Sequence, residues 1–297
     1  MKFHVLYYDR GTEEDRVGLK YLKSLLGTSE AEVSLVYVTQ DFSKMPDERR
    51  RDLAREQRSQ KQEFQSNEAL MEAQEILQGD NLTLTTSAVE GDPVAEVEKL
   101  LKEHSFDLLG ISAFGRGGFS KNILGAHASK LIKETQLPVL IHKGQLDGCE
   151  RVLIHVPAKE ERCVRFIRYI SNLLQGSSPA VTLLSVVEEE HSRFDGYTSG
   201  DMGLTDSIEN YEQRKHAELK PLKTAKEILQ QRGIEANLRY RTGDLSDELL
   251  QEAKEGRYDL MTFAPEQPGL LASVWEGSKS FEVMRDVEIS VLKYFHK

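Results

Sequence analysis

The sequence predicts an α/β fold with two tandem doubly wound domains, each built on a parallel sheet. Two observations support this prediction. Short apolar runs alternate with helical patterns along the whole chain, which is typical of a parallel sheet covered by helices on both faces. The second half of the chain also repeats the order and spacing of the first. We therefore expect one such domain over residues 1–145 and another over residues 149–297.

The repeat keeps a constant register over long stretches. Residues 91–109, GDPVAEVEKLLKEHSFDLL, align with residues 243–261, GDLSDELLQEAKEGRYDLM, which lie 152 positions later. Farther upstream the offset is 148, because VSLVYV at residues 33–38 aligns with VTLLSV at residues 181–186. A series of matches in register indicates a tandem duplication of one structural unit.

Five strands are expected in each half, in the same order. Those of the first half are expected at residues 3–8, 33–38, 81–89, 106–114 and 137–143. Those of the second half are expected at residues 151–156, 181–186, 235–243, 258–264 and 289–297. Their short apolar character predicts strands that are buried on both faces, and right-handed crossovers then give the doubly wound arrangement.

Helical patterns follow the first four strands of each half. The long polar helix after the second strand is expected to end at Gly79 in the first half and at Gly233 in the second, because glycine commonly follows a helix C-terminus. The helix after the third strand is expected to begin at Asp92-Pro93 in the first half and at Ser246 in the second. The last helix of each half is expected after a loop that contains glycine.

Composition excludes several classes of protein. The net charge of −10 argues against broad binding to nucleic acid or to anionic membranes. No apolar run approaches the roughly 20 residues that span a bilayer. Cys149 and Cys163 are too few for a disulfide scaffold, and the first residues enter a strand pattern without a signal peptide. These features predict a cytoplasmic protein.

Motifs for catalysis and metal binding are not found in the sequence. It contains neither the G-x4-G-K-(S/T) loop of P-loop nucleotide hydrolases nor the G-x-S-x-G turn of serine hydrolases. GRGGFS at residues 115–120 lacks the final glycine of a dinucleotide fingerprint. His127, His142 and His155 have no cysteine or carboxylate at ligand spacing, so no metal site is expected.

The chain resembles the universal stress protein family, in particular its tandem two-domain members. The order of elements, Asp9 after the first strand and the closing strand PVLIHK carry the resemblance. Nucleotide-binding members of that family have G-x2-G-x9-G-(S/T) after the fourth strand. The corresponding positions here are Ser112-x2-Gly115-x9-Gly125-Ala126. The resemblance implies a Rossmann-like fold of the adenine nucleotide alpha hydrolase type.

The resemblance also implies a ligand site in the first half, with ATP or AMP as the expected ligand. Asp9 would contact the ribose, Val38 would lie near the adenine, and the loop from Gly115 to Gly125 would hold phosphates. Around that loop, Ser112 and Ala126 depart from the motif, because serine adds a side chain and alanine lacks a hydroxyl donor. Arg116 is a candidate partner for a phosphate.

The second half departs further from the nucleotide-binding pattern. Pro157 is expected at the position that Asp9 has in the first half, which removes the carboxylate. Gln267 and Pro268 add bulk and rigidity where the backbone would approach a ligand. Gly277-Ser278 keeps the end of the motif, either as a remnant binding position or as a helix start without a ligand.

The resemblance therefore implies a stress-response regulatory protein that binds an adenylate in its first domain and is not a dedicated catalyst. Two alternatives remain open: a protein-interaction module that binds no nucleotide, and an enzyme that hydrolyses adenine nucleotides. The closing strands are expected to pair the two domains within one chain. A further homodimer and protein partners are left open, the latter through the charge-rich segment at residues 46–79. The acidic segment at residues 188–207 is either an insertion or a lid.

Overall fold

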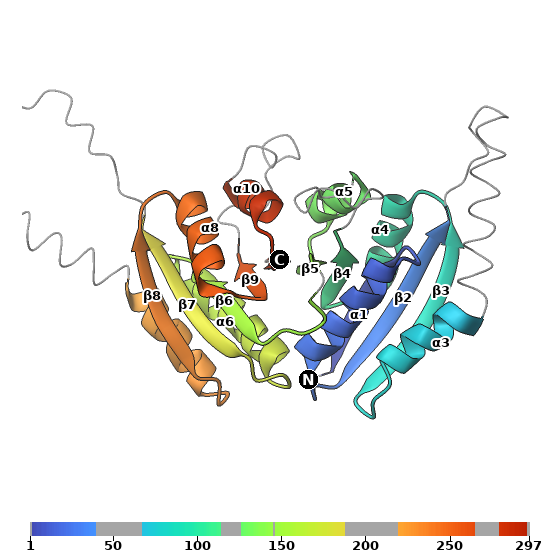
Figure 1. The fold of residues 1–297 in the computed structure, drawn as a ribbon, viewed down its shortest axis with the longest axis horizontal. Helices are drawn as coiled ribbons and strands as arrows, with labels where there is room; N and C mark the ends of the chain where they lie inside the picture. The colour runs from blue at the N-terminus through green and yellow to red at the C-terminus, as the bar shows by residue number, and fades with distance from the viewer. Residues whose placement is uncertain are drawn as a thin grey trace, which may run out of the picture.

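The computed structural model describes residues 2–39, 67–113, 126–144, 146–187, 219–264 and 279–295. Within these ranges the chain forms one ten-stranded sheet with helices on both faces (Figure 1). Strand order is β3-β2-β1-β4-β5-β10-β9-β6-β7-β8. No helix in this part of the chain combines the length and the apolar character that a membrane crossing requires.

The first half contributes five strands and four described helices. The strands are β1 (Phe3–Asp9), β2 (Ala31–Thr39), β3 (Leu82–Glu90), β4 (Leu108–Ser112) and β5 (Val139–His142). The helices are α1 (Glu13–Leu26), α3 (Asn67–Ile76), α4 (Pro93–Glu103) and α5 (Ala126–Glu134). Caps fix two of the helix starts: Thr12 and Asp15 form a capping box at α1, and the Asp92 side chain accepts from the Ala95 amide at α4.

The second half repeats this series. Its strands are β6 (Arg151–His155), β7 (Ala180–Val187), β8 (Ala236–Thr242), β9 (Leu260–Phe263) and β10 (Ser290–Lys293). Its helices are α6 (Glu160–Leu174), α8 (Leu245–Gly256) and α10 (Lys279–Asp286), and residues 219–230 are also helical. The expected fold class, two tandem doubly wound units, is therefore confirmed.

Strand pairing is parallel within each half and antiparallel only where the halves meet. β1 pairs with β2 and β4, and β6 pairs in the same way with β7 and β9. At the seam, β10 runs antiparallel to β5, with Leu292 opposite Leu140. The two closing strands thus join two five-stranded sheets into one, and β3 and β8 lie at its outer ends (Figure 1).

Two apolar cores cover the two faces of this sheet. One contains the buried side of α1 and α6, with Leu22 and Phe166 among its fully buried side chains. The other contains the inner sides of α4, α5, α8 and α10, with Val97 and Met284 among its members. Both clusters take residues from both halves, so each core is continuous across the seam.

Some helix ends differ from the expectations. α3 ends at Ile76, three residues before Gly79, and the helix in the second half ends at residue 230, before Gly233. Gly233 adopts a φ of 74°, so it provides the left-handed turn after that helix rather than its last residue. α8 begins at Leu245 instead of Ser246, because the Asp244 side chain caps it by accepting from the amides of residues 246 and 247.

Candidate functional site

Three of the expected ligand residues lie at one edge of the first-half sheet. Asp9 is the last residue of β1, Val38 is the penultimate residue of β2, and Ser112 is the last residue of β4. β1 and β4 are neighbours, and the strand order reverses between them. Asp9 and Ser112 therefore flank the topological switch point, where open parallel sheets bind their ligands.

The remaining candidates are placed only in part. Ala126 is the first residue of α5, and nothing further is described of its side chain. Five candidates lie outside the described residues: Gly115, Arg116, Gly125, Gly277 and Ser278. The segment at residues 188–207 and most of the charge-rich segment at residues 46–79 also lie outside them.

Asp9 is the centre of a buried charged cluster. Its side chain is fully buried, and both oxygens have partners: the Gly11 amide donates to Oδ1 at 2.7 Å and Arg16 Nη1 donates to Oδ2 at 2.8 Å. Burial, followed by the nearby Asp15 carboxylate, raises the pKa of Asp9 to about 6, although Arg16 acts in the opposite direction. Arg16 Nε also lies 3.7 Å from Glu72 on α3.

A second carboxylate, Asp15, organises the turn between β1 and α1. It is fully buried and accepts hydrogen bonds from the Arg10 amide, the Arg10 guanidinium and the Thr12 hydroxyl. Asp15 thus belongs both to the N-terminal cap of α1 and to the buried charged cluster. Sequence reasoning identified Asp9 but missed Asp15 and Arg16, although the four acidic and two basic residues at positions 9–16 could have indicated an ion cluster.

Ser112 belongs to a buried polar group on the α1 face. Its hydroxyl lies 2.8 Å from the Tyr7 hydroxyl and donates to the Glu14 carbonyl at 3.3 Å. Gly18 on α1 makes room for this group, because an added Cβ would meet Ser112 Oγ at 2.6 Å and His142 Nδ1 at 3.4 Å. His142 Nε2 bonds the Leu146 carbonyl, whereas its buried Nδ1 has no hydrogen-bond partner within the described ranges.

Strand register identifies the second-half counterpart of Asp9 and corrects one expectation. Val5 lies opposite Val33 and Leu108, and Val152 lies opposite Val181 and Leu260. Since these partners are themselves equivalent in the repeat, Val152 is the counterpart of Val5. Counting four residues on, the counterpart of Asp9 is Val156 and not Pro157. The expected loss of the carboxylate stands, but at a different residue.

The polar cluster of the first half is apolar in the second. Register along the strands pairs Tyr7 with Ile154, Ser112 with Ala264 and His142 with Tyr294. Along α1 and α6 the offset is 148, because the Tyr21 and Tyr169 hydroxyls make reciprocal bonds to the Asp259 and Asp107 carbonyls. This offset pairs Asp15 with Cys163, Arg16 with Val164 and Gly18 with Phe166. Phe166 and Tyr294 pack with ring centroids 5.3 Å apart. Within the described residues, the buried charged cluster of Asp9, Asp15 and Arg16 therefore has no counterpart in the second half.

His142, His155 and both cysteines pack in the interior of the protein. His142 and His155 are buried, and burial lowers the pKa of both, that of His155 to about 4. Cys149 and Cys163 are buried and free. Across the described ranges, no three or more histidine, cysteine or acidic side chains are grouped so that they could hold a metal ion.

The fold and this edge define the class: a doubly wound α/β protein with two repeats in one sheet and a polar switch-point edge in the first repeat. The model of the universal stress protein family matches residues 3–143. This match covers the first half of the chain, and the second half repeats the same fold.

Solved structures show the same fold along the whole chain. A universal stress protein from Archaeoglobus fulgidus DSM 4304 is 18% identical, with a TM-score of 0.63, and the match covers 99% of this chain and 98% of that chain. A functionally unknown protein from Pseudomonas aeruginosa PAO1 is 13% identical, with a TM-score of 0.60, covering 98% and 92%. No curated protein matches the chain.

Proposed function

We propose that this protein is a tandem universal stress protein that binds an adenine nucleotide, ATP or AMP, in its first domain and acts as a regulatory ligand-binding protein. The domains are residues 1–145 and 149–297, and the second is a structural partner of the first. This function requires no chemical step, so we propose no catalytic residue.

One observation carries the proposal: among the described residues, the buried charged cluster at the switch-point edge occurs only in the first half. Asp9, Arg16 and Ser112 are replaced there by Val156, Val164 and Ala264. A buried charged cluster is costly to maintain, because each ion loses its hydration. Polar groups concentrated at the ligand-binding edge of an α/β sheet therefore favour a binding role over a purely structural one.

The chemistry of the cluster suits a nucleoside. A carboxylate accepts hydrogen bonds from the hydroxyl groups of a ribose, and Asp9 has lone pairs beyond the two that Gly11 and Arg16 use. Arg16 supplies a positive charge next to it. Because Asp9 is fully buried, contact with a ribose requires neighbouring side chains to move.

The decisive variant is Asp9→Asn, which keeps the size of the side chain and removes its charge. We expect AMP and ATP to raise the melting temperature of the wild-type chain, and AMP to give saturable binding in isothermal titration calorimetry. In Asp9→Asn, AMP affinity should fall by about tenfold or more, since a charge-assisted hydrogen bond is lost.

Ser185→Ala is the matched control, because Ser185 is a buried polar residue near the carboxyl end of β7 in the second half. It should bind AMP like the wild type. Equal loss in both variants would contradict a site in the first half, and phosphate release from ATP above a protein-free blank would favour the hydrolase instead.

A protein-interaction module without a nucleotide is the second candidate, and one observation favours it. Both oxygens of Asp9 are already occupied within the chain, and its side chain has no exposed surface. On this reading the cluster only stabilises the start of α1. No thermal shift and no calorimetric heat with either nucleotide would support it.

A further inference from the structure

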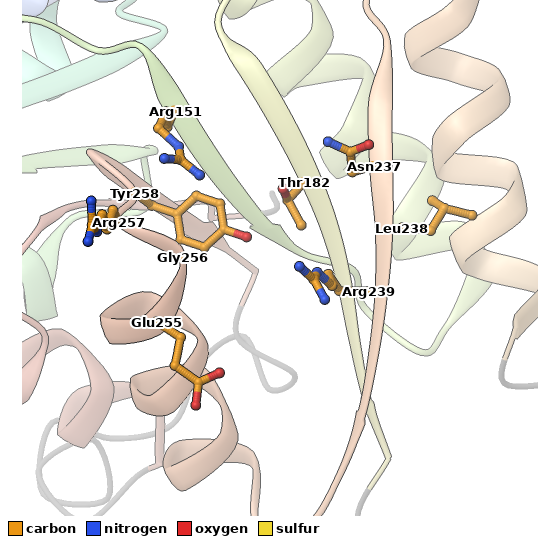
Figure 2. A pocket seen from close by; sticks show the side chains of 9 residues that line it. All are labelled: Arg151, Thr182, Asn237, Leu238, Arg239, Glu255, Gly256, Arg257 and Tyr258. Atoms are coloured by element: carbon orange, nitrogen blue, oxygen red, sulfur yellow. The ribbon is translucent and has the colours of Figure 1, made fainter.

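A groove at the opposite edge of the second-half sheet has a composition that its counterpart in the first half lacks. It has a volume of about 770 Å³ and is lined by the starts of β6 and β8, by Thr182 of β7 and by the C-terminal end of α8. Figure 2 shows the side chains of Arg151 and Arg239 directed toward the ring of Tyr258, with Arg257 on the other side of that ring.

The first half has a groove at the equivalent place, with a volume of about 570 Å³. Register makes the two comparable residue by residue: His4 and Arg151 both donate their amides to an aspartate carboxylate, Asp107 in the first half and Asp259 in the second. Each groove is therefore a product of the fold, and differences in lining reflect the two sequences.

The difference is one of charge. Arg151 replaces His4, Arg239 replaces Ser87, and Arg257 replaces Ser105. The first-half groove also contains Glu32, which forms an ion pair with Lys2, whereas Ala180 occupies that position in the second half. The second-half groove thus gains three guanidinium groups and has the carboxylate of Glu255 in its lining instead of that of Glu32.

These three guanidinium groups are not neutralised within the part of the chain that the structure describes. None of them has a carboxylate within 4.0 Å there, and Arg151 instead lies over the Tyr258 ring at 5.8 Å. The two nearby carboxylates are engaged elsewhere. Glu255 accepts from Arg241 and Gln251, and Asp259 accepts from backbone amides.

The backbone is also adapted to this arrangement. An added Cβ at Gly256 would collide with the Tyr258 ring, so glycine is required for the ring to lie at the end of α8. Arg257 adopts a left-handed φ of 52°, a conformation that usually belongs to glycine or asparagine. A long cationic side chain in a strained position suggests a role beyond ending the helix.

We propose that this groove, the arginine groove, binds a small polyphosphate, with Arg151, Arg239 and Arg257 as its ligands. One guanidinium group can donate two parallel hydrogen bonds to the oxygens of a phosphate. Three guanidinium groups therefore suit a ligand with more than one phosphoryl group. The volume lies within the range of small-molecule sites. The net charge of −10 would repel a polymeric polyanion, whereas a small one can enter a local positive site.

A simpler explanation is that the arginines balance the negative end of the α8 dipole. The first half argues against it, because α4 ends at the same place with His104 and Ser105 and no arginine. Arg239 and Arg151 also come from strands, and a helix end needs no side chain from either strand. Helix termination therefore does not explain the three replacements.

Pyrophosphate, titrated calorimetrically at fixed ionic strength, tests the proposal. We expect saturable binding to the full chain at one site. Arg239→Gln and Arg257→Asn should each weaken it by about tenfold, since each removes charge-assisted hydrogen bonds. Arg257→Asn is especially informative, because asparagine tolerates the left-handed conformation and should leave the melting temperature unchanged or higher.

Arg168→Gln is the matched control: Arg168 is exposed on α6, on the opposite face of the sheet, and carries the same charge. It should leave pyrophosphate affinity unchanged. The proposal is overturned by the absence of saturable binding, by unchanged binding in Arg239→Gln and Arg257→Asn, by equal weakening in Arg168→Gln, or by tighter binding of a single-stranded oligonucleotide.

The proposals of the arginine groove and of the adenylate site can be tested independently of each other. Asp9→Asn should retain pyrophosphate binding and lose AMP binding. Arg239→Gln should show the reverse pattern. Because ATP contains a polyphosphate, ATP binding that survives in Asp9→Asn and disappears in Arg239→Gln would assign that ATP to the groove.

Discussion

His155, the last residue of β6, is a titratable group held in an apolar core. Its side chain is only 8% exposed, and burial alone lowers the pKa of the imidazole to about 4. The unfolded chain takes up this proton near pH 6.5. Between these values the unfolded state binds more protons than the folded state, so stability is complete above pH 6.5 and is lost as the pH falls toward 4.

His155→Gln should remove this pH dependence. Urea unfolding at pH 7 and pH 4.5 should show that the wild type loses more stability than the variant, by on the order of 2 kcal/mol. The exposed His4 provides the control, since His4→Gln should follow the wild type at both values. Parallel loss of stability in wild type and His155→Gln would contradict the assignment.

At the residue scale, the sequence predicted positions better than partners. Asp9 and Ser112 could be placed at strand ends, because an apolar run that stops at a polar residue marks the edge of a buried sheet. The Asp9–Arg16 ion pair could not be predicted, since it depends on how α1 packs over β1. The one-residue error at Pro157 arose because the repeat offset is 147 along β6 and 148 along β7.

At the element scale, two buried lysines connect each half to a helix of the other. Lys143 follows β5, and its Nζ donates to the carbonyls of Met284, Arg285 and Val287 at the end of α10. Lys293 ends β10, and its Nζ donates to the Ile132 carbonyl of α5 at 3.0 Å. Burial lowers the pKa of Lys143 to about 8 and that of Lys293 to about 7.

Lys143→Met should destabilise the chain by about 1–3 kcal/mol, because buried helix carbonyls lose their donor. Chemical denaturation with Lys130→Met as a control would measure this, since Lys130 is exposed on α5. A more stable Lys143→Met variant would show instead that the desolvation of the ammonium outweighs its hydrogen bonds.

The sequence predicted all ten strands and the start of α4, but not the capping box of α1 or the Asp244 cap of α8. Alternation of apolar runs and helical patterns sets the strands, and the Asp92-Pro93 pair fixes the start of α4. The exchange of lysines across the seam was missed. Lys293 ends the strand SVLK and Lys143 directly follows β5, and a lysine at the end of a strand is usually expected to be exposed. Only the contact of each lysine with the end of a helix of the other half shows its role.

At the scale of the whole molecule, the two halves meet through contacts that occur in reciprocal pairs. The Tyr21 hydroxyl of α1 donates to the Asp259 carbonyl, and the equivalent Tyr169 hydroxyl of α6 donates to the Asp107 carbonyl, each at 3.0 Å. Gly27 and Gly176 touch at the turns after α1 and α6, where a Cβ on either would collide with the backbone of the other turn.

Gly176→Ala should therefore destabilise the whole chain, by roughly 3 kcal/mol, because overpacking at a backbone contact cannot be relieved by rotating a side chain. Gly233→Ala is the comparison: its φ is 74° but nothing lies within 4 Å of the added Cβ, so it should cost only about 1 kcal/mol of backbone strain. Equal effects in urea unfolding would mean that the turns can separate without loss.

The seam between β5 and β10 gives the chain a freedom that an assembly of two identical subunits does not have. In such an assembly, every substitution appears on both sides of the axis, so a change that adds an arginine to one groove adds it to the other. Here the two sides are encoded separately. The second half can therefore have valine at the position equivalent to Asp9 and arginine at the position equivalent to Ser87. The tyrosine and glycine contacts that hold the halves together are kept.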